Sequence, residues 1–339
     1  MKKQFFTKKN LALIISPVLV TCLGLGVFFG VKSNTNNKED NEVNNQYNEI
    51  DYSYSKVFLK DKDNTLVPLT IKYEKFDSLG EELMYVTNML KVDSKVSNST
   101  FKGLLPSNTK VKSLELKDNV LNLNFDENFM TYDSKDELRL LESLVWTLTD
   151  FNEVDSINLY VNDERLTNMP VSNTPIKFNV DRQIGINNYL LTSSMMLGSQ
   201  RVLSYYEKLI DDNYYYVPVT HYVKNNKNLS IYDLTVTTMF KDPGITSSLN
   251  VCRALQDTTM VASSVLEKEV LYLSLSEDIL FDELTVSLDV YEIFKEVTCL
   301  LDEVKDVSFL IELEEVMVNG LNKDEPEQVS KIELNKYYI

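Results

Sequence analysis

A short motif occurs twice in this chain of 339 residues. Residues 66–70 read LVPLT and residues 216–220 read YVPVT, so the second copy follows the first by 150 positions. The same offset relates Leu123 to Leu273 and Glu153 to Glu303. A constant offset over most of the chain indicates an internal duplication, so the sequence predicts two copies of one module of about 115–140 residues.

The spacing of apolar residues gives the order of elements in each copy, because strands alternate and helices repeat at three and four residues. Strands are expected in the first copy near residues 56–59, 66–73, 114–116, 121–125 and 157–161. Helices are expected after Ser78 and Ser134, each followed three positions later by a glutamate, as in a capping box. The second copy repeats the pattern. We therefore expect an α+β fold of two tandem β-β-α-β-β-α-β modules.

The segments outside the two modules differ from them in composition. Asn and acidic residues dominate the stretch before the first module, which lacks apolar periodicity and is typical of a flexible tether. We expect a cytoplasmic tail at 1–9, a transmembrane anchor at 10–31, a tether at 32–55, the first module at 56–168, a connector at 169–200, the second module at 201–320 and a polar, frayed tail at 321–339.

The expected anchor is an apolar run near the N-terminus. Residues 11–31 carry no charge, and at about 1.5 Å per residue a helix of this length spans the roughly 30 Å of a hydrocarbon core. Four lysines precede the run, which favours a cytoplasmic N-terminus and an extracytoplasmic location for the rest of the chain. An alternative is a lipoprotein, because residues 19–22 (LVTC) resemble a lipobox in which Cys22 is lipidated. Both readings place the modules on the same side of the membrane.

The charge of the chain argues against one class of partner. The net charge is −17, and the first 33 residues contain five lysines and no acid. The remainder therefore has 29 basic and 51 acidic residues. Such a surface repels phosphate backbones, so we expect no binding of nucleic acid.

Residues that support catalysis are sparse. His221 is the single histidine and falls in an expected strand, which argues against zinc sites built from several histidines. Asp126 and Glu127 follow a strand and are interpreted as a polar loop. We expect no enzyme activity, and no catalytic, cofactor-binding or metal-binding residues. Cys252 and Cys299 are interpreted as small buried apolar residues, with a disulfide between them as the alternative.

Three consecutive tyrosines offer a candidate contact surface. Tyr214, Tyr215 and Tyr216 lie in an expected strand, where alternate side chains point to opposite faces, so at least one should lie off the core. Tyrosine is enriched at protein interfaces. We take these three residues as candidates for a partner contact, the alternative being ordinary cover of the sheet.

Three stretches of the first copy resemble the GerMN domain family of sporulation and germination proteins: residues 105–111 (LPSNTKV), 120–129 (VLNLNFDENF) and 146–157 (WTLTDFNEVDSI). The second copy matches less closely, with Gln256 opposite Pro106. The resemblance implies a sheet-and-helix module similar to ring-building motifs. It also implies a non-enzymatic part of an envelope assembly, whose partners are other envelope proteins in a ring or channel complex.

These observations lead to one main hypothesis and one alternative. The main hypothesis is a membrane-anchored extracytoplasmic scaffold that binds partner proteins. The alternative is an extracellular module that binds a ligand or the cell wall, which a concave pocket with converging polar groups would favour.

Overall fold

The computed structural model describes residues 51–188, 198–241, 251–255, 259–282, 284–301, 303–321 and 334–337. The expected anchor at 10–31 and Cys22 lie outside these ranges. Within them, no helix is both long enough and apolar enough to cross a membrane. The described residues all belong to one compact unit within Glu49–Ile339.

The first module has the expected order of elements and ends in one additional short strand. Its strands are β1 (Tyr52–Lys60), β2 (Leu66–Glu74), β3 (Val111–Lys117), β4 (Val120–Phe125), β5 (Ser156–Val161) and β6 (Glu164–Arg165). Its helices are α1 (Leu79–Met89) and α2 (Glu137–Leu148), with 3-10 turns η1 (Glu127–Thr131), η2 (Ser134–Asp136) and η3 (Arg182–Ile184). β1 begins inside the range expected as tether, because Tyr52 pairs with Glu74 in β2 and its ring lies under the Lys72 ammonium.

The second module repeats this order with two additional short strands, β9 and β12. Its strands are β7 (Ser199–Ile210), β8 (Asn213–Lys224), β9 (Val251–Arg253), β10 (Val261–Glu267), β11 (Val270–Leu275), β12 (Thr285–Val286), β13 (Asp306–Ile311) and β14 (Glu314–Val318). Its helices are α4 (Ile231–Met239) and α5 (Leu288–Thr298), with the 3-10 turn η5 (Glu277–Ile279).

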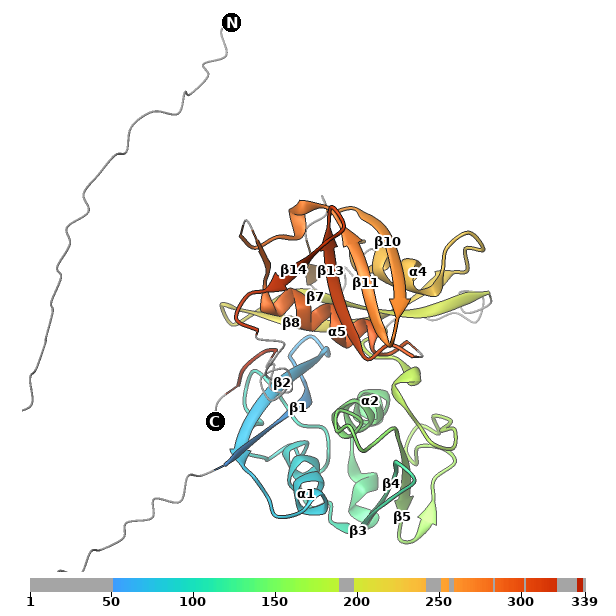
Figure 1. The fold of residues 1–339 in the computed structure, drawn as a ribbon. Coiled ribbons are helices and arrows are strands. Elements are labelled where there is room, and N and C mark those ends of the chain that lie inside the picture. The colour runs from blue at the N-terminus through green and yellow to red at the C-terminus, as the bar shows by residue number, and fades with distance from the viewer. Residues whose placement is uncertain are drawn as a thin grey trace, which may run out of the picture. The chain divides into compact units, whose positions relative to one another are not determined.

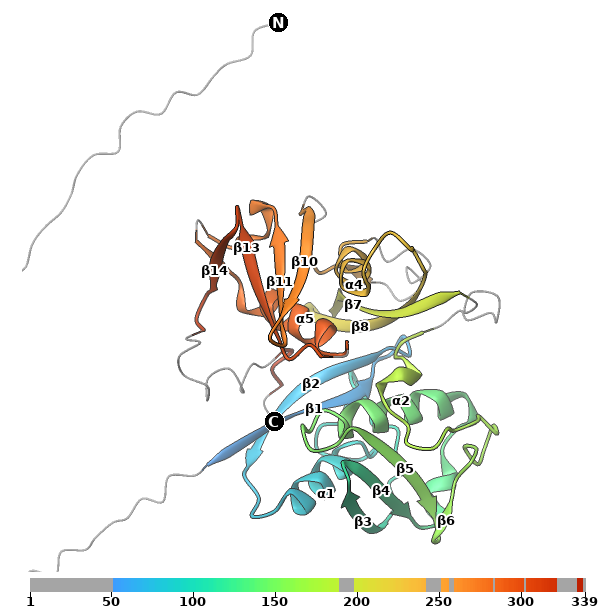
Figure 2. The same ribbon diagram turned by 45° about the vertical axis from the view of Figure 1, so that its right-hand side comes forward.

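In each module the helices lie between the opening hairpin and the remaining strands (Figures 1 and 2). α2 contacts β1 on one side and β5 on the other, and α5 contacts β7 and β13 in the same way. A helix between two layers buries more than one stripe. In α2 every residue except Leu138 is buried, and Leu138 is 43% exposed.

The pairing of strands confirms the duplication residue by residue. Val111 pairs with Phe125, and a bulge follows before Ser113. Val261 pairs with Leu275, and a bulge follows before Ser263. The parallel pairing of β4 with β5 recurs in β11 with β13 at the same offset of 150. Because a one-residue slip would turn every side chain to the other face, this agreement is a strict test.

One of the two expected capping boxes forms, and a serine also caps the corresponding helix of the second module. Ser78 caps α1 by accepting from the Glu81 amide, and Ser230 caps α4 by accepting from the Asp233 amide. The expected capping box of Ser134 with Glu137 is wrong, because Ser134 begins a 3-10 turn. The Glu137 carboxylate instead accepts the amides of residues 171, 172 and 174, so it fixes the start of the connector on the first module.

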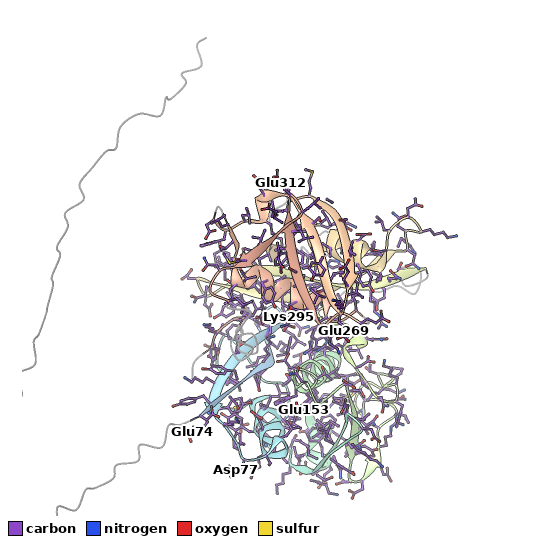
Figure 3. All side chains as sticks on the ribbon, viewed as in Figure 1. Glu74, Asp77, Glu153, Glu269, Lys295 and Glu312 are labelled. Carbon is purple, nitrogen blue, oxygen red and sulfur yellow. The ribbon has the colours of Figure 1, made fainter. Side chains whose placement is uncertain are left out.

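Most of the side chains are drawn in Figure 3, where labelled acidic residues such as Glu74, Asp77 and Glu153 lie on the outside of the first module. All three are exposed. Acidic residues outnumber basic ones in this chain, 51 to 34, which agrees with an isoelectric point of about 4.6.

Candidate functional site

The repeated motif LVPLT/YVPVT lies where the two modules meet, on the outer edges of β2 and β8. Pro68 and Pro218 stand at the centre of these edges. Proline has no N–H to donate to a neighbouring strand, and β2 and β8 belong to separate sheets. Because the two prolines offer no N–H, carbonyl groups on the facing edges of β2 and β8 need other hydrogen-bond partners.

Two asparagine side chains supply those partners. Asn187 accepts from the Leu66 amide at 2.7 Å and donates to the carbonyls of Leu66 and Pro218 at 2.8 and 2.9 Å. Asn335 accepts from the Tyr216 amide at 2.8 Å and donates to the carbonyls of Tyr216 and Pro68, each at 2.7 Å. The two asparagines thus make the same three bonds with the modules exchanged. We call this pair of side chains and the two strand edges the asparagine clasp.

Backbone bonds extend the clasp on both sides. Thr220 of β8 exchanges bonds with Ile186, which follows the first module. Thr70 of β2 forms hydrogen bonds with backbone groups of the segment 334–337, which follows the second module. The expectation of a frayed tail is therefore wrong for residues 334–337, and Leu334 is 2% exposed. Each module is completed by the segment that trails the other one.

Replacing Asn187 with alanine should lower the free energy of unfolding by roughly 1–3 kcal/mol, because the Leu66 amide and two carbonyls lose their partner in a buried place. Asn187 is fully buried, so water does not reach those groups in the folded state. Urea denaturation of wild type and variant measures the difference. Asn152→Ala, at an exposed position, is the control and should change stability by less than about 0.5 kcal/mol. Equal stability of the Asn187 variant and the control would contradict the clasp.

A buried ion pair joins the modules near the clasp. The two hairpins can be aligned through their strand pairing, in which Lys60 lies opposite Leu66 and Glu207 lies opposite Tyr216. The residues that follow Lys60 and Glu207 are Asp61 and Lys208. These two residues therefore hold equivalent positions in the two modules. They meet each other: the Lys208 ammonium lies 2.6 Å from Asp61 Oδ2, and the side chains are 1% and 0% exposed. Lys208 also contacts Asp63 and donates to Thr65 Oγ1.

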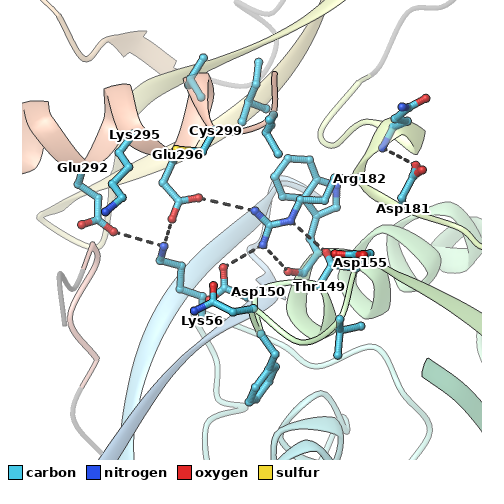
Figure 4. Close-up of a pocket in the computed structure, with 18 of the residues that line it drawn as sticks. Lys56, Thr149, Asp150, Asp155, Asp181, Arg182, Glu292, Lys295, Glu296 and Cys299 are labelled. Atoms are coloured by element: carbon cyan, nitrogen blue, oxygen red, sulfur yellow. Dashed lines mark hydrogen bonds and ion pairs between the residues drawn. The ribbon is translucent and has the colours of Figure 1, made fainter. Parts of the chain in front are cut away.

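A second ionic cluster lies on the wall of a cleft of about 2000 Å³ that residues of both modules line. Glu296 of α5 binds Lys56 of β1 and lies 3.7 Å from Arg182. Arg182 also donates to Asp150 at 2.9 Å, and Glu292 lies 3.3 Å from the Lys56 ammonium. The close-up in Figure 4 shows the five side chains converging.

The cluster neutralises its own charges. Lys56 and Arg182 come from the first module and its connector, and each contacts a carboxylate of α5. The Arg182 guanidinium also lies over the Trp146 ring, 4.8 Å from its centroid. Because the cations are held by carboxylates of the same chain, the cluster fits a role in fixing the second module on the first better than a role in binding an anion.

Glu292 makes the stability of this cluster depend on pH. Burial raises the pKa of its carboxyl to about 7, with Lys56 opposing and the carboxylates of Glu296 and Asp150 adding to the rise. Between about pH 4.5 and 7 the folded state therefore holds a proton that the unfolded state has released, so the free energy of unfolding falls as pH rises through this window.

We expect Glu292→Gln to remove this part of the pH dependence. The wild type should lose on the order of 2 kcal/mol relative to the variant between about pH 5 and pH 8. Urea denaturation of both proteins at the two pH values measures the difference. Comparison with the variant cancels the contributions of other carboxyl groups. A wild-type curve that stays parallel to the variant curve would contradict the raised pKa.

The structure separates the three candidate tyrosines. Tyr214 is 66% exposed, which confirms that at least one lies off the core. The Tyr215 ring packs edge-on against Phe101 at 5.1 Å, and the Tyr216 backbone belongs to the clasp. Tyr215 and Tyr216 therefore contact this chain's own first module and its tail.

The other residues considered for chemistry have structural surroundings. His221 lies in β8, hydrogen-bonds Tyr206 at 2.8 Å, and burial lowers its pKa to about 4. Cys299 is a free cysteine whose thiol pKa burial raises to about 11; the Cys252 side chain lies outside the described residues. Asp126 bonds the Lys110 amide, as a loop residue does. Within the described ranges, no group of His, Cys, Asp and Glu side chains is arranged to hold a metal ion.

The sequence analysis missed the two clasp asparagines. Each follows an aliphatic residue, in Ile186-Asn187 and Leu334-Asn335, and the pairs lie 148 positions apart. That spacing is close to the offset of the modules, so a search for short repeats in the polar segments would have found it. The buried cations Lys56, Arg182 and Lys208 carry no comparable signal, because charged residues in strands and loops usually face water.

Known proteins resemble this chain over both modules. Residues 56–167 match the Germane family, described as acting in sporulation and spore germination. The spore germination protein GerM of Bacillus subtilis (strain 168) is 26% identical over 280 residues, which cover 81% of this chain and 76% of that protein. The solved tandem GerMN domains of the B. subtilis sporulation protein GerM share the fold, with a TM-score of 0.69 at 24% identity, over 84% of this chain and 99% of theirs.

Proposed function

We propose that this chain, which is similar to GerM over both modules, is a membrane-anchored extracytoplasmic scaffold. In this role it binds other envelope proteins within a sporulation-associated assembly. Residues 10–31 anchor it, the N-terminus stays in the cytoplasm, and both modules lie outside the membrane. The scaffold turns over no substrate.

The observation that supports this proposal most strongly is the asparagine clasp. The segment that follows each module bonds the opening hairpin of the other module, so the pair forms one body rather than two domains on a linker. A rigid body with exposed strands and helix faces suits a structural part, because preorganised surfaces lose little conformational entropy on binding. Tyr214, with its exposed ring, is a candidate contact on this body.

The proposal is tested with the full-length protein in its own cells. Membranes are cross-linked, solubilised, and the tagged protein is recovered for mass spectrometry. We expect envelope proteins to be recovered with the wild type, and fewer of them with a Tyr214→Ser variant if that ring makes the contact. Digestion of both modules by protease added to intact protoplasts checks the topology, and full protection would overturn it.

The cleft between the modules supports the alternative of a wall-binding module, since residues of both modules line it and several are polar. A wall ligand would have to compete with the ion pairs that Lys56 and Arg182 already make. Saturable binding of purified wall fragments, together with no recovery of envelope proteins, would replace the scaffold by this alternative.

A further inference from the structure

One edge of the second module carries a groove of about 800 Å³ that apolar and acidic side chains line together. It lies between the loop that follows η5 and the hairpin of β13 and β14. Leu280, Phe281 and Leu284 line it on the loop side, and Ile311 and Val316 line it on the hairpin side. We call it the hairpin groove. The turn of the hairpin is marked by Glu312 in Figure 3.

Large apolar side chains are exposed around the hairpin groove to a degree that the fold does not require. Of the apolar residues that line it, Phe281 is 68% exposed and Leu284 is 70%. Leu313, between the lining residues Glu312 and Glu314 at the hairpin turn, is 84% exposed. Single exposed apolar residues are ordinary, but a cluster of them on one surface marks an interaction site.

The first module shows that the fold tolerates polar residues at these positions. At the offset of 150, Thr131 corresponds to Phe281, Ser134 to Leu284, and Asp163 to Leu313. Asp163 is bound by Lys112 and by the Asn124 amide. The exposed apolar residues are therefore a property of the second module and not of the shared fold.

The backbone of the turn supports the same reading. Glu312 and Leu313 have φ of 52° and 73°, and the corresponding Asn162 and Asp163 have 48° and 70°. Asn and Asp adopt positive φ readily, whereas a leucine there is strained. A strained and exposed leucine weakens the free protein, and strain of this kind is found at binding sites.

Acidic side chains surround the apolar floor. Glu277, Asp282, Glu312 and Glu314 line the hairpin groove, and the described lining residues include no lysine or arginine. A partner must match both features. Its apolar side chains would bind the apolar floor, and positive charges opposite the acidic rim would guide its approach. We propose that the hairpin groove binds a basic amphipathic segment of a partner protein, with leucine-like side chains on the floor and lysine or arginine at the rim.

This inference rests on the proposed partner-binding role and adds the surface that binds the partner. It predicts which surface is used and what chemistry the partner presents. The cross-linking experiment tests the role, and variants of the hairpin groove test the surface. If wild type and groove variants recover the same envelope proteins in the same amounts, the role stands and the groove inference fails.

The direct test uses the full-length chain in nanodiscs of zwitterionic lipid and labelled peptides of about 15 residues, long enough to cover one groove. One peptide contains only Leu and Lys in an amphipathic pattern, a second replaces Lys with Glu, and a third replaces Leu with Ser. Fluorescence anisotropy above the signal of empty nanodiscs reports binding. We expect saturable binding of the Leu/Lys peptide, and neither of the others should match its affinity.

Variants that copy the first module identify the site. Phe281→Thr combined with Leu284→Ser removes two apolar side chains of the lining and should weaken binding of the Leu/Lys peptide by about tenfold or more. Met260→Thr is the matched control, because Met260 is 71% exposed outside the groove, and it should leave the affinity unchanged. Glu312→Lys with Glu314→Lys should shift the preference towards the Leu/Glu peptide.

Three results would overturn the inference. The first is equal affinity of the wild type for the Leu/Lys and Leu/Glu peptides. The second is unchanged affinity in the variant that copies the first module. The third is a dimer of the chain that disappears in that variant, which would assign the hairpin groove to a second copy of the chain.

Discussion

Lys208→Met is expected to lower the free energy of unfolding by about 3–5 kcal/mol, because it strands a buried carboxylate. Asp61 is 0% exposed and its Oδ2 atom lies 2.6 Å from the Lys208 ammonium. Methionine fills a similar volume without charge, so the loss comes from the unpaired carboxylate and not from a cavity. Chemical denaturation of wild type and variant at neutral pH measures it.

A second substitution separates the charge from the packing. Asp61→Asn in the Lys208→Met background removes the stranded charge and should recover part of the lost stability. The Asp61 side chain also accepts the amides of Asp63 and Thr65, and an asparagine oxygen can accept the same bonds. A double variant no more stable than the single one would contradict this explanation.

The control is an ion pair of the same chemistry on the surface. Lys305 and Glu269 lie 2.7 Å apart, but their side chains are 73% and 56% exposed. Solvent screens exposed pairs, so Lys305→Met should cost no more than about 1 kcal/mol. The difference between the two lysine variants then measures the effect of burial at the junction of the modules.

The sequence predicted the modules because their cores are built from local patterns. Leu121, Leu123 and Phe125 alternate along β4, and all three are fully buried. Alternation of this kind depends only on which face of the strand meets the core. The constant offset then carried the same assignment to the second module, where Leu271 and Leu273 are also fully buried.

The junction between the modules could not be predicted in the same way. Asn187 makes bonds to Leu66, 121 positions away, and no local pattern distinguishes it from a loop asparagine. Lys208 shares its face of β7 with the buried residues Tyr206 and Ile210 and is 1% exposed, but nothing in the strand indicates that its partner is an acid of the other module. Whether such a residue is buried depends on the residues of the other module that contact it. The sequence of one strand carries no information about those contacts.

The last prediction concerns the two cores and the junction together. Leu123 and Leu273 are both fully buried and occupy equivalent positions, paired with Leu159 and Phe309 of the next strand. Replacing either with alanine removes apolar contacts and leaves a cavity, so each variant should lose about 2–5 kcal/mol. Denaturant titration of each variant measures the loss.

The number of unfolding transitions distinguishes one cooperative unit from two. The asparagine clasp and the Lys208–Asp61 pair tie the opening hairpins of both modules together, so unfolding of one module removes the partners of buried groups in the other. Leu123→Ala and Leu273→Ala should therefore each shift one shared transition, seen alike by far-ultraviolet circular dichroism and by fluorescence of Trp146 in the first module. If Leu273→Ala produced an early transition that left the Trp146 signal unchanged, the second module would unfold alone and the clasp would not couple them.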